Sequence, residues 1–173
     1  MKLRYLVKGL PGHPLHPPLT DATIGTYTVA TALGCASVIG VSHVQAAHGW
    51  WLALVAGLCF TVPTALTGLI EWLSIEWGTP LWRTATLHLF VMVSATVIFL
   101  IAALVGHAGY KHGAVETGPF ILTLAAFGTM TLGGWLGGTV VFVHGMRVLN
   151  LVTEPAKRAF APVPKPEKEL AEK

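Results

Sequence analysis

Long stretches without any charged residue constrain the fold of this chain more than any other feature. No Asp, Glu, Lys or Arg occurs between Asp21 and Glu71, from Thr84 to Tyr110, or from Thr117 to Met146. Only 11% of the residues are charged, whereas soluble domains carry about a quarter. A helix needs about 20 apolar residues to cross the hydrocarbon core of a bilayer, so the first stretch can hold two spans and the others one each. We therefore expect an integral membrane protein that lies in a lipid bilayer.

The charge-free stretches divide into four hydrophobic helices, which we place at about residues 20–41, 50–73, 84–106 and 119–146. The connections between them are short, and short connections between successive spans give an antiparallel arrangement. Lipid offers no hydrogen-bond partners to an open structure, so the backbone must satisfy its own polar groups. The sequence predicts an all-α integral membrane protein built as a four-helix up-down-up-down transmembrane bundle.

The basic residues are concentrated on one side of this predicted bundle. Ten of the eleven Lys and Arg residues fall there, and only Lys111 falls on the other side. Because positive residues stay in the cytoplasm, we expect a multi-pass protein of the bacterial inner membrane with both termini cytoplasmic. Residues 1–150 would form the transmembrane domain, and residues 151–173 a disordered cytoplasmic tail. This charge distribution accounts for the pI near 9.0, so nucleic acid is not an expected partner.

Cysteine and tryptophan positions fit the same arrangement. Cys35 and Cys59 fall in the middle of apolar stretches, and we interpret both as small buried apolar residues rather than as a disulfide. Five tryptophans fall at predicted helix ends, where an indole can bury its ring while its N–H stays hydrated. We expect the following to be interfacial anchors: Trp50, Trp51, Trp72, Trp77 and Trp82.

All eight histidines fall near predicted helix ends, and the expected topology sorts them into two layers. The layer toward the cytoplasmic face contains His13, His16, His88 and His144, together with Asp21 and Glu71. The opposite layer, in the predicted polar connections, contains His43, His48, His107 and His112. Ionisable groups within spans usually face the bundle interior. We therefore expect the groups of the cytoplasmic layer to point at one another, with at least one from each helix.

Helical spacing agrees with this expectation. Glu71 shares a face with Gly68, and His144 shares a face with Gly137 and Gly133, because residues three or four apart lie on the same side of a helix. The Gly-x-x-x-Gly pair at 133 and 137 lets a neighbouring backbone or a flat ligand approach closely. Faces of this kind are expected inside a bundle rather than against lipid.

One chemistry that fits this layer is b-type haem. Two histidines from different helices can bind haem iron from opposite sides, while a glycine face makes room for the porphyrin. His88 and His144 are the natural pair, His16 is an alternative ligand, and His13 could approach the haem edge or propionates. The predicted haem-binding residues are His13, His16, His88, Gly133, Gly137 and His144. The chain would then be an electron-transfer subunit that connects a membrane quinone with a redox protein such as an iron–sulfur or cytochrome partner.

A divalent transition metal is the second chemistry that fits. The ligand set for zinc, iron or copper would be His16, Glu71, His88 and His144, whose atom types suit such ions. No short spacing such as His-x-x-x-His accompanies it. The sequence also shows no nucleophile–base pair and no phosphate-binding loop, so hydrolase and nucleotide-driven functions have no support.

Each group also has an interpretation without a cofactor. Histidines near helix ends can be interfacial groups, Glu71 can pair with His88 or Arg83, and Asp21 can cap the first helix. The chain would then be a structural or accessory subunit that binds another membrane protein, and an oligomer is compatible with this role. A transporter is a third alternative, although Pro63 is the one proline that interrupts a predicted span.

The segment at residues 12–18, with the sequence GHPLHPP, is the most unusual part of the chain. Its prolines at 14, 17 and 18 predict an extended chain before the first span rather than a regular helix. In a polyproline-like conformation, residues three apart lie on the same side. His13 and His16 could therefore both be presented to the mouth of the bundle.

Three parts of the sequence resemble a bacterial membrane family named domain of unknown function 2231. They are residues 12–18 (GHPLHPP), residues 66–72 (LTGLIEW), and residues 133–138 (GGWLGG) followed by His144 and Gly145. The resemblance implies a four-helix membrane protein. Some relatives carry a similar membrane domain joined to a Rieske-type iron–sulfur domain, which implies electron transfer by association. Two cysteines cannot form such a domain here, and Glu71 stands where the family often has Asp.

Overall fold

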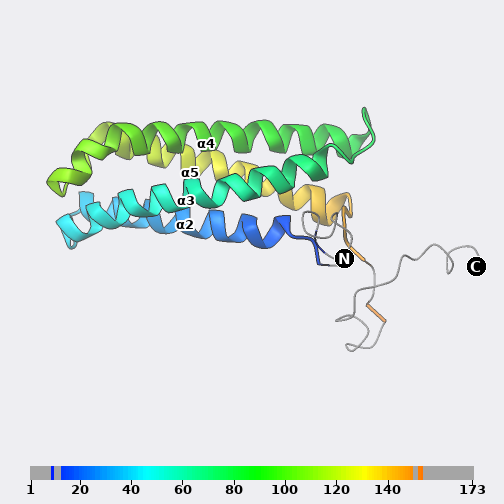
Figure 1. Cartoon of the computed structure of the whole chain (residues 1–173), viewed down its shortest axis with the longest axis horizontal. Helices are drawn as coiled ribbons and strands as arrows, with labels where there is room; N and C mark the ends of the chain where they lie inside the picture. The colour runs from blue at the N-terminus through cyan, green and yellow to red at the C-terminus, as the bar shows by residue number, and fades with distance from the viewer. Residues whose placement is uncertain (1–8, 10–12, 150–151, 154–173) are drawn as a thin grey trace, which may run out of the picture.

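The computed structural model describes residue 9, residues 13–149 and residues 152–153. This part of the chain folds into four long helices and a short π-helix that continues the last of them (Figure 1). They are α2 (His16–Val38), α3 (His43–Trp72), α4 (Pro80–His112), α5 (Thr117–Gly138) and η1 (Thr139–Val143). The helices lie side by side with alternating direction, so that α2 begins and η1 ends at the same end of the molecule. The predicted all-α class is confirmed.

The first three helices are longer than the sequence predicted, and all three connections are shorter. Residues 39–42, 73–79 and 113–116 form the three connections. The outer histidines were expected in polar connections, and this prediction is wrong: His43 and His48 lie in α3, and His107 and His112 lie in α4. A helix satisfies its own backbone groups, so polar residues at its ends do not stop it from continuing to the turn.

The GHPLHPP segment follows the prediction only in part: residues 13–15 precede the helix, but Pro17 and Pro18 lie within it. Helix α2 begins at His16, with Pro17 and Pro18 in its first turn. The first turn tolerates proline because its N–H groups have no partner within the helix. Asp21 was considered as a cap for this helix, but it lies in the second turn and is exposed. The cap position is Leu15, whose side chain makes no capping hydrogen bond.

Three of the described helical segments are long and apolar enough to cross a membrane, namely His43–Trp72, Pro80–His112 and Thr117–Val143. Large apolar side chains cover their outer surfaces, where a soluble protein would carry charges. Examples that are at least half exposed are Val62, Leu66, Phe90, Leu104, Trp135 and Phe142. An outer surface of this composition suits lipid. Of the predicted tail at residues 151–173, the structure describes only residues 152–153, so the prediction of a disordered tail lies outside the described part.

Helices α2 and α3 pack closely together, as do α4 and α5, so the fold consists of two helical hairpins. Tyr27 of the first hairpin stacks face to face on Phe99 of the second, with ring centroids 3.8 Å apart and planes inclined by 3°. Both rings are buried. The two hairpins are therefore in close contact midway along their helices, although α2 packs only sparsely against α5.

Trp50 is a core residue and not the interfacial anchor that was predicted. Its ring is completely buried between Gly34 of α2 and Gly106 of α4, both of which are too close to it to carry a side chain without rearrangement. Its Nε1–H donates to Thr123 Oγ1 over 3.2 Å. The two cysteines, in contrast, are less buried than predicted. Both are free, but Cys59 is exposed and Cys35 is half-buried on the outside of the helices.

Replacement of Trp50 tests the packing between hairpins. Trp50→Ala should lower the free energy of unfolding by about 3–5 kcal/mol, because it empties a fully enclosed space. SDS-induced unfolding of the purified protein in detergent measures the change. The matched control is Trp77→Ala, since Trp77 is 79% exposed and its loss should change the free energy by about 0.5 kcal/mol or less. Equal losses for the two variants would contradict this account of the core.

Candidate functional site

A cavity of about 840 Å³ lies between the two hairpins, at the end of the molecule where α2 begins. All four helices contribute to its lining, which is mainly apolar. Its charged or titratable lining residues, apart from tyrosine, are His13, His16, Asp21, Glu71, His88 and Arg147. Ligand sites in proteins usually have volumes of about 300–1,000 Å³ and a few well-placed polar groups. The cavity therefore has the size and composition of a ligand site.

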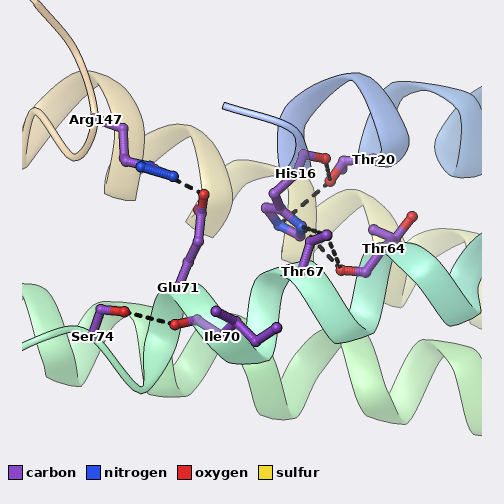
Figure 2. A network of polar contacts seen from close by, with 8 residues as sticks. All are labelled: His16, Thr20, Thr64, Thr67, Ile70, Glu71, Ser74 and Arg147. Carbon is purple, nitrogen blue, oxygen red and sulfur yellow. Dashed lines mark hydrogen bonds and ion pairs between the residues drawn. The ribbon is translucent and has the colours of Figure 1, made fainter. Parts of the chain in front are cut away.

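His16 reaches this cavity from the first turn of α2 and is held by α3 (Figure 2). Its Nδ1 lies 3.0 Å from the carbonyl oxygen of Thr64 and 3.2 Å from Thr67 Oγ1. The imidazole rests on Gly68, where a Cβ would come within 2.7 Å of its Cε1. A side chain at position 68 would therefore displace the ring.

His88 occupies the corresponding place in the second hairpin. Its Nδ1 lies 2.8 Å from the carbonyl oxygen of Gly133 on α5. Its ring rests on Gly137, where a Cβ would come within 3.0 Å of the ring Cε1. His16 and His88 line the same cavity, one from each hairpin.

These hydrogen bonds determine which nitrogen of each ring is available. A carbonyl oxygen only accepts, so the Nδ1 atom of His16 and that of His88 each carry a proton and donate. In the neutral imidazole the lone pair is then on Nε2. The Thr20 hydroxyl is 3.5 Å from His16 Nε2, but it donates to the His16 carbonyl over 3.0 Å. Both histidines thus offer Nε2 as a ligand atom, the arrangement that metal-binding histidines commonly show.

The two hairpins repeat the same construction. His88 follows His16 by 72 residues, and Phe99 follows Tyr27 by the same interval. On the second helix of each hairpin, the glycine beneath the ring comes four residues after the carbonyl that accepts from Nδ1. Gly34 and Gly106, which both contact Trp50, are also 72 residues apart. The site therefore presents two equivalent imidazoles, one from each repeat.

The sequence analysis did not detect this repeat, although the sequence contains its signal. Each hairpin has a histidine, an aromatic residue 11 positions later, and a glycine 18 positions after the histidine. Outside these positions, and Ala30 with Ala102, the two segments differ in most residues. Because each position taken alone is common in helical membrane proteins, the pattern becomes visible only when the contacts of the two rings are compared.

Of the other predicted ligands, His13 (for haem) and Glu71 (for a metal ion) line the cavity, but His144, predicted for both, is not among its lining residues. His144 Nε2 lies 3.0 Å from Thr84 Oγ1 on the first turns of α4. His144 thus lies outside the cavity lining, whereas His16 and His88 both belong to it. The Met92 side chain fills the space beside Gly133. Of the two predicted glycines, only Gly137 therefore lines the cavity.

Glu71 pairs with Arg147, and not with the predicted partners His88 or Arg83. Glu71 Oε1 accepts from Arg147 Nε over 3.2 Å at the cavity mouth (Figure 2). Arg147 follows η1 and has a left-handed backbone (φ 62°). Its role was missed because the residue lies in an irregular segment, where helical spacing carries no information.

The predicted metal-ligand set does not assemble into a compact group. In residues 13–149 no three or more His, Cys, Asp or Glu side chains lie together as ligands for a metal ion. At the opposite end, His48 and His107 contact aromatic rings instead. The Tyr110 ring contacts both imidazoles, and Trp51 stacks on Tyr110 with centroids 4.5 Å apart.

The apolar helices of spanning length and their lipid-suited surfaces define the class of this protein as a helical membrane protein. Comparison with known families agrees. The chain belongs to the DUF2231 family, described as a predicted membrane protein, whose family model matches residues 12–150. The resemblance noted from the sequence is thus confirmed. No curated protein and no solved structure matches the chain.

The tautomers of the two cavity histidines provide a direct test of this geometry. In ¹⁵N NMR spectra of the histidine-labelled protein, the rings of His16 and His88 should both be protonated at Nδ1 and not at Nε2, because each Nδ1 donates to a carbonyl. His16→Gln and His88→Gln identify the two signals by their disappearance. Protonation of either ring at Nε2 alone would contradict the hydrogen bonds described above.

Proposed function

We propose that the chain crosses the bacterial inner membrane four times, with the cavity at the cytoplasmic end. Helix α2 is the added span, with 23 residues and close packing on α3, itself long and apolar enough to cross. The helix contains five threonines, and each of their hydroxyls donates to the carbonyl four residues earlier. These bonds lower the cost of placing the hydroxyls in lipid. Arg83 and Arg147 at the cavity end, against Lys111 at the other, support the orientation.

Cysteine labelling in intact cells tests this topology. In a Cys35→Ala, Cys59→Ala background, Glu116→Cys should react with a membrane-impermeant maleimide from outside. Leu15→Cys and Glu76→Cys should react only after permeabilisation. The reverse pattern would contradict the orientation, and labelling of both Leu15→Cys and Glu116→Cys from outside would show that α2 does not span.

We further propose that the cavity binds b-type haem and that the chain is an electron-transfer subunit. The observation that carries this proposal is the pair of equivalent imidazoles, His16 and His88, each fixed through Nδ1 with Nε2 available. Fixing a ring through Nδ1 sets its orientation and raises the basicity of Nε2. If haem is bound, His16 and His88 would hold its iron, because histidines on separate helices of a bundle can ligate it.

The remaining lining also suits a flat, largely apolar ligand. Gly134, Gly137 and Gly138 line the cavity, and a Cβ at Gly134 would meet no atom within 4 Å. Met92, Tyr27 and Phe99 add apolar surface further from the mouth. A divalent ion would need further ligands besides the two rings. For this reason we favour haem over a non-haem metal.

In this function, His16 and His88 hold and orient the group, and the apolar walls exclude water from it. Haem supplies reversible one-electron chemistry when bound. The electron donor and acceptor that we propose are a membrane quinone and a redox protein such as an iron–sulfur or cytochrome partner.

Absorption spectra of the purified protein, expressed with added haem, test the proposal. The wild type should show a Soret band and the sharp reduced-minus-oxidised bands of six-coordinate haem. His16→Ala and His88→Ala should each abolish the six-coordinate spectrum, because each removes one axial ligand. His112→Ala is a matched control, since His112 is exposed in the last turn of α4.

Two other results would lead to different conclusions. Loss of the bands in His144→Ala but not in His16→Ala would assign the ligands to His88 and His144. A wild type that stays colourless after haem-supplemented expression would end the haem proposal. If that colourless protein also co-purified with a stoichiometric membrane protein, the accessory-subunit alternative would replace it.

A further inference from the structure

The charged groups of the cavity are not spread over its lining but lie together at the mouth. His13, Asp21, Glu71 and Arg147 come from the N-terminal side of α2, the last turns of α3 and the segment after η1. Apart from these residues, the lining consists of His16, His88, Tyr27, threonines and apolar residues. A ligand that fills this space must therefore be amphiphilic, with its polar groups at one edge.

The two hairpins, although they repeat one construction, differ in the carboxylates that they contribute to the cavity lining. The interval between the two glycines under the rings, 69 residues, places Val140 where the first hairpin has Glu71. The interval between the two histidines places Val93 where it has Asp21. The two hairpins provide the same imidazole, but only the first provides carboxylates. The ligand is therefore held symmetrically at its centre and asymmetrically at its edge.

Among the described residues that line the cavity, Arg147 is the one permanently charged cation. Glu71 Oε1 accepts from its Nε, and the Glu71 side chain is 12% exposed, so the carboxylate fixes the guanidinium at the entrance. A guanidinium carries five N–H donors in a planar fork, which lets it join more than one carboxylate. Glu71 thus balances the charge of Arg147 and orients it at the same time.

We infer that Arg147 binds the carboxylate edge of the ligand and that Glu71 positions it. This inference rests on the proposed function, in which the ligand is haem and the carboxylates are its two propionates. Charge-assisted hydrogen bonds from arginine to carboxylate are stronger than neutral ones. Arg147 would then fix which edge of the haem faces the cytoplasmic end, while the histidines bind its iron.

Titration of the apoprotein with two probes, haem and haem dimethyl ester, tests the inference. The ester keeps the iron and the porphyrin but has no carboxylate. Arg147→Gln should weaken the binding of haem about tenfold and leave the binding of the ester unchanged. Arg83→Gln is the matched control, because Arg83 is exposed at the same end and does not line the cavity; it should change neither. Retained ester binding by Arg147→Gln shows that the variant is folded.

The possible results separate this inference from the proposed function. Equal haem affinity in the wild type and Arg147→Gln, with six-coordinate spectra in both, overturns only the role of Arg147. An equal loss of affinity for haem and for the ester also overturns it, because the effect would not depend on carboxylates. A wild type that binds neither probe overturns both proposals. A tenfold loss with Arg83→Gln would show a general effect of positive charge rather than a contact.

Discussion

Hydrogen bonds from two imidazoles to backbone carbonyls organise the functional end of this protein. A carbonyl within a helix already accepts one backbone hydrogen bond, but its second lone pair can accept from a side chain on a neighbouring helix. His16 and Thr64 make such a bond in the first hairpin, and His88 and Gly133 make it in the second. Each bond joins the two helices of a hairpin and leaves the lone pair of the neutral ring on Nε2. Packing within the hairpin and preparation of the site therefore depend on the same contact.

Small residues make this contact possible. In a bilayer, helices are not driven together by the hydrophobic effect, so close approach and hydrogen bonding must supply the association. Gly68 and Gly137 each accept an imidazole against the helix backbone, and Gly34 and Gly106 do the same for the Trp50 indole. Glycine thus serves throughout the fold as the surface on which a planar side chain lies. The cavity continues this pattern, because a flat ligand could occupy such a surface in the same way.

Sequence reasoning predicted the architecture more fully than the site. Charge-free stretches defined the helical class, since charge is costly in lipid whatever the packing. Depth along the helices was also informative, and His13, His16, Glu71 and His88 line one cavity. Which side chains contact one another at that depth could not be predicted from the sequence. His144 lies at a similar depth to His88 but bonds to Thr84, because the rotation of η1 relative to α5 depends on the π-helical backbone. The pairing of Glu71 with Arg147 depends likewise on a left-handed turn that no periodicity encodes.

The stacked rings of Tyr27 and Phe99 have a consequence for energy coupling. They come from both repeats and meet about three helical turns from the histidines, or roughly 16 Å along the helix axis. Trp50, completely buried, fills the interior beyond them. Moving one elementary charge across a whole membrane costs about 2.3 kcal/mol per 100 mV. An electron that enters and leaves on the histidine side of this aromatic layer crosses little of that field. In the proposed function, the midpoint potentials of its partners would drive the reaction, with little contribution from the membrane voltage.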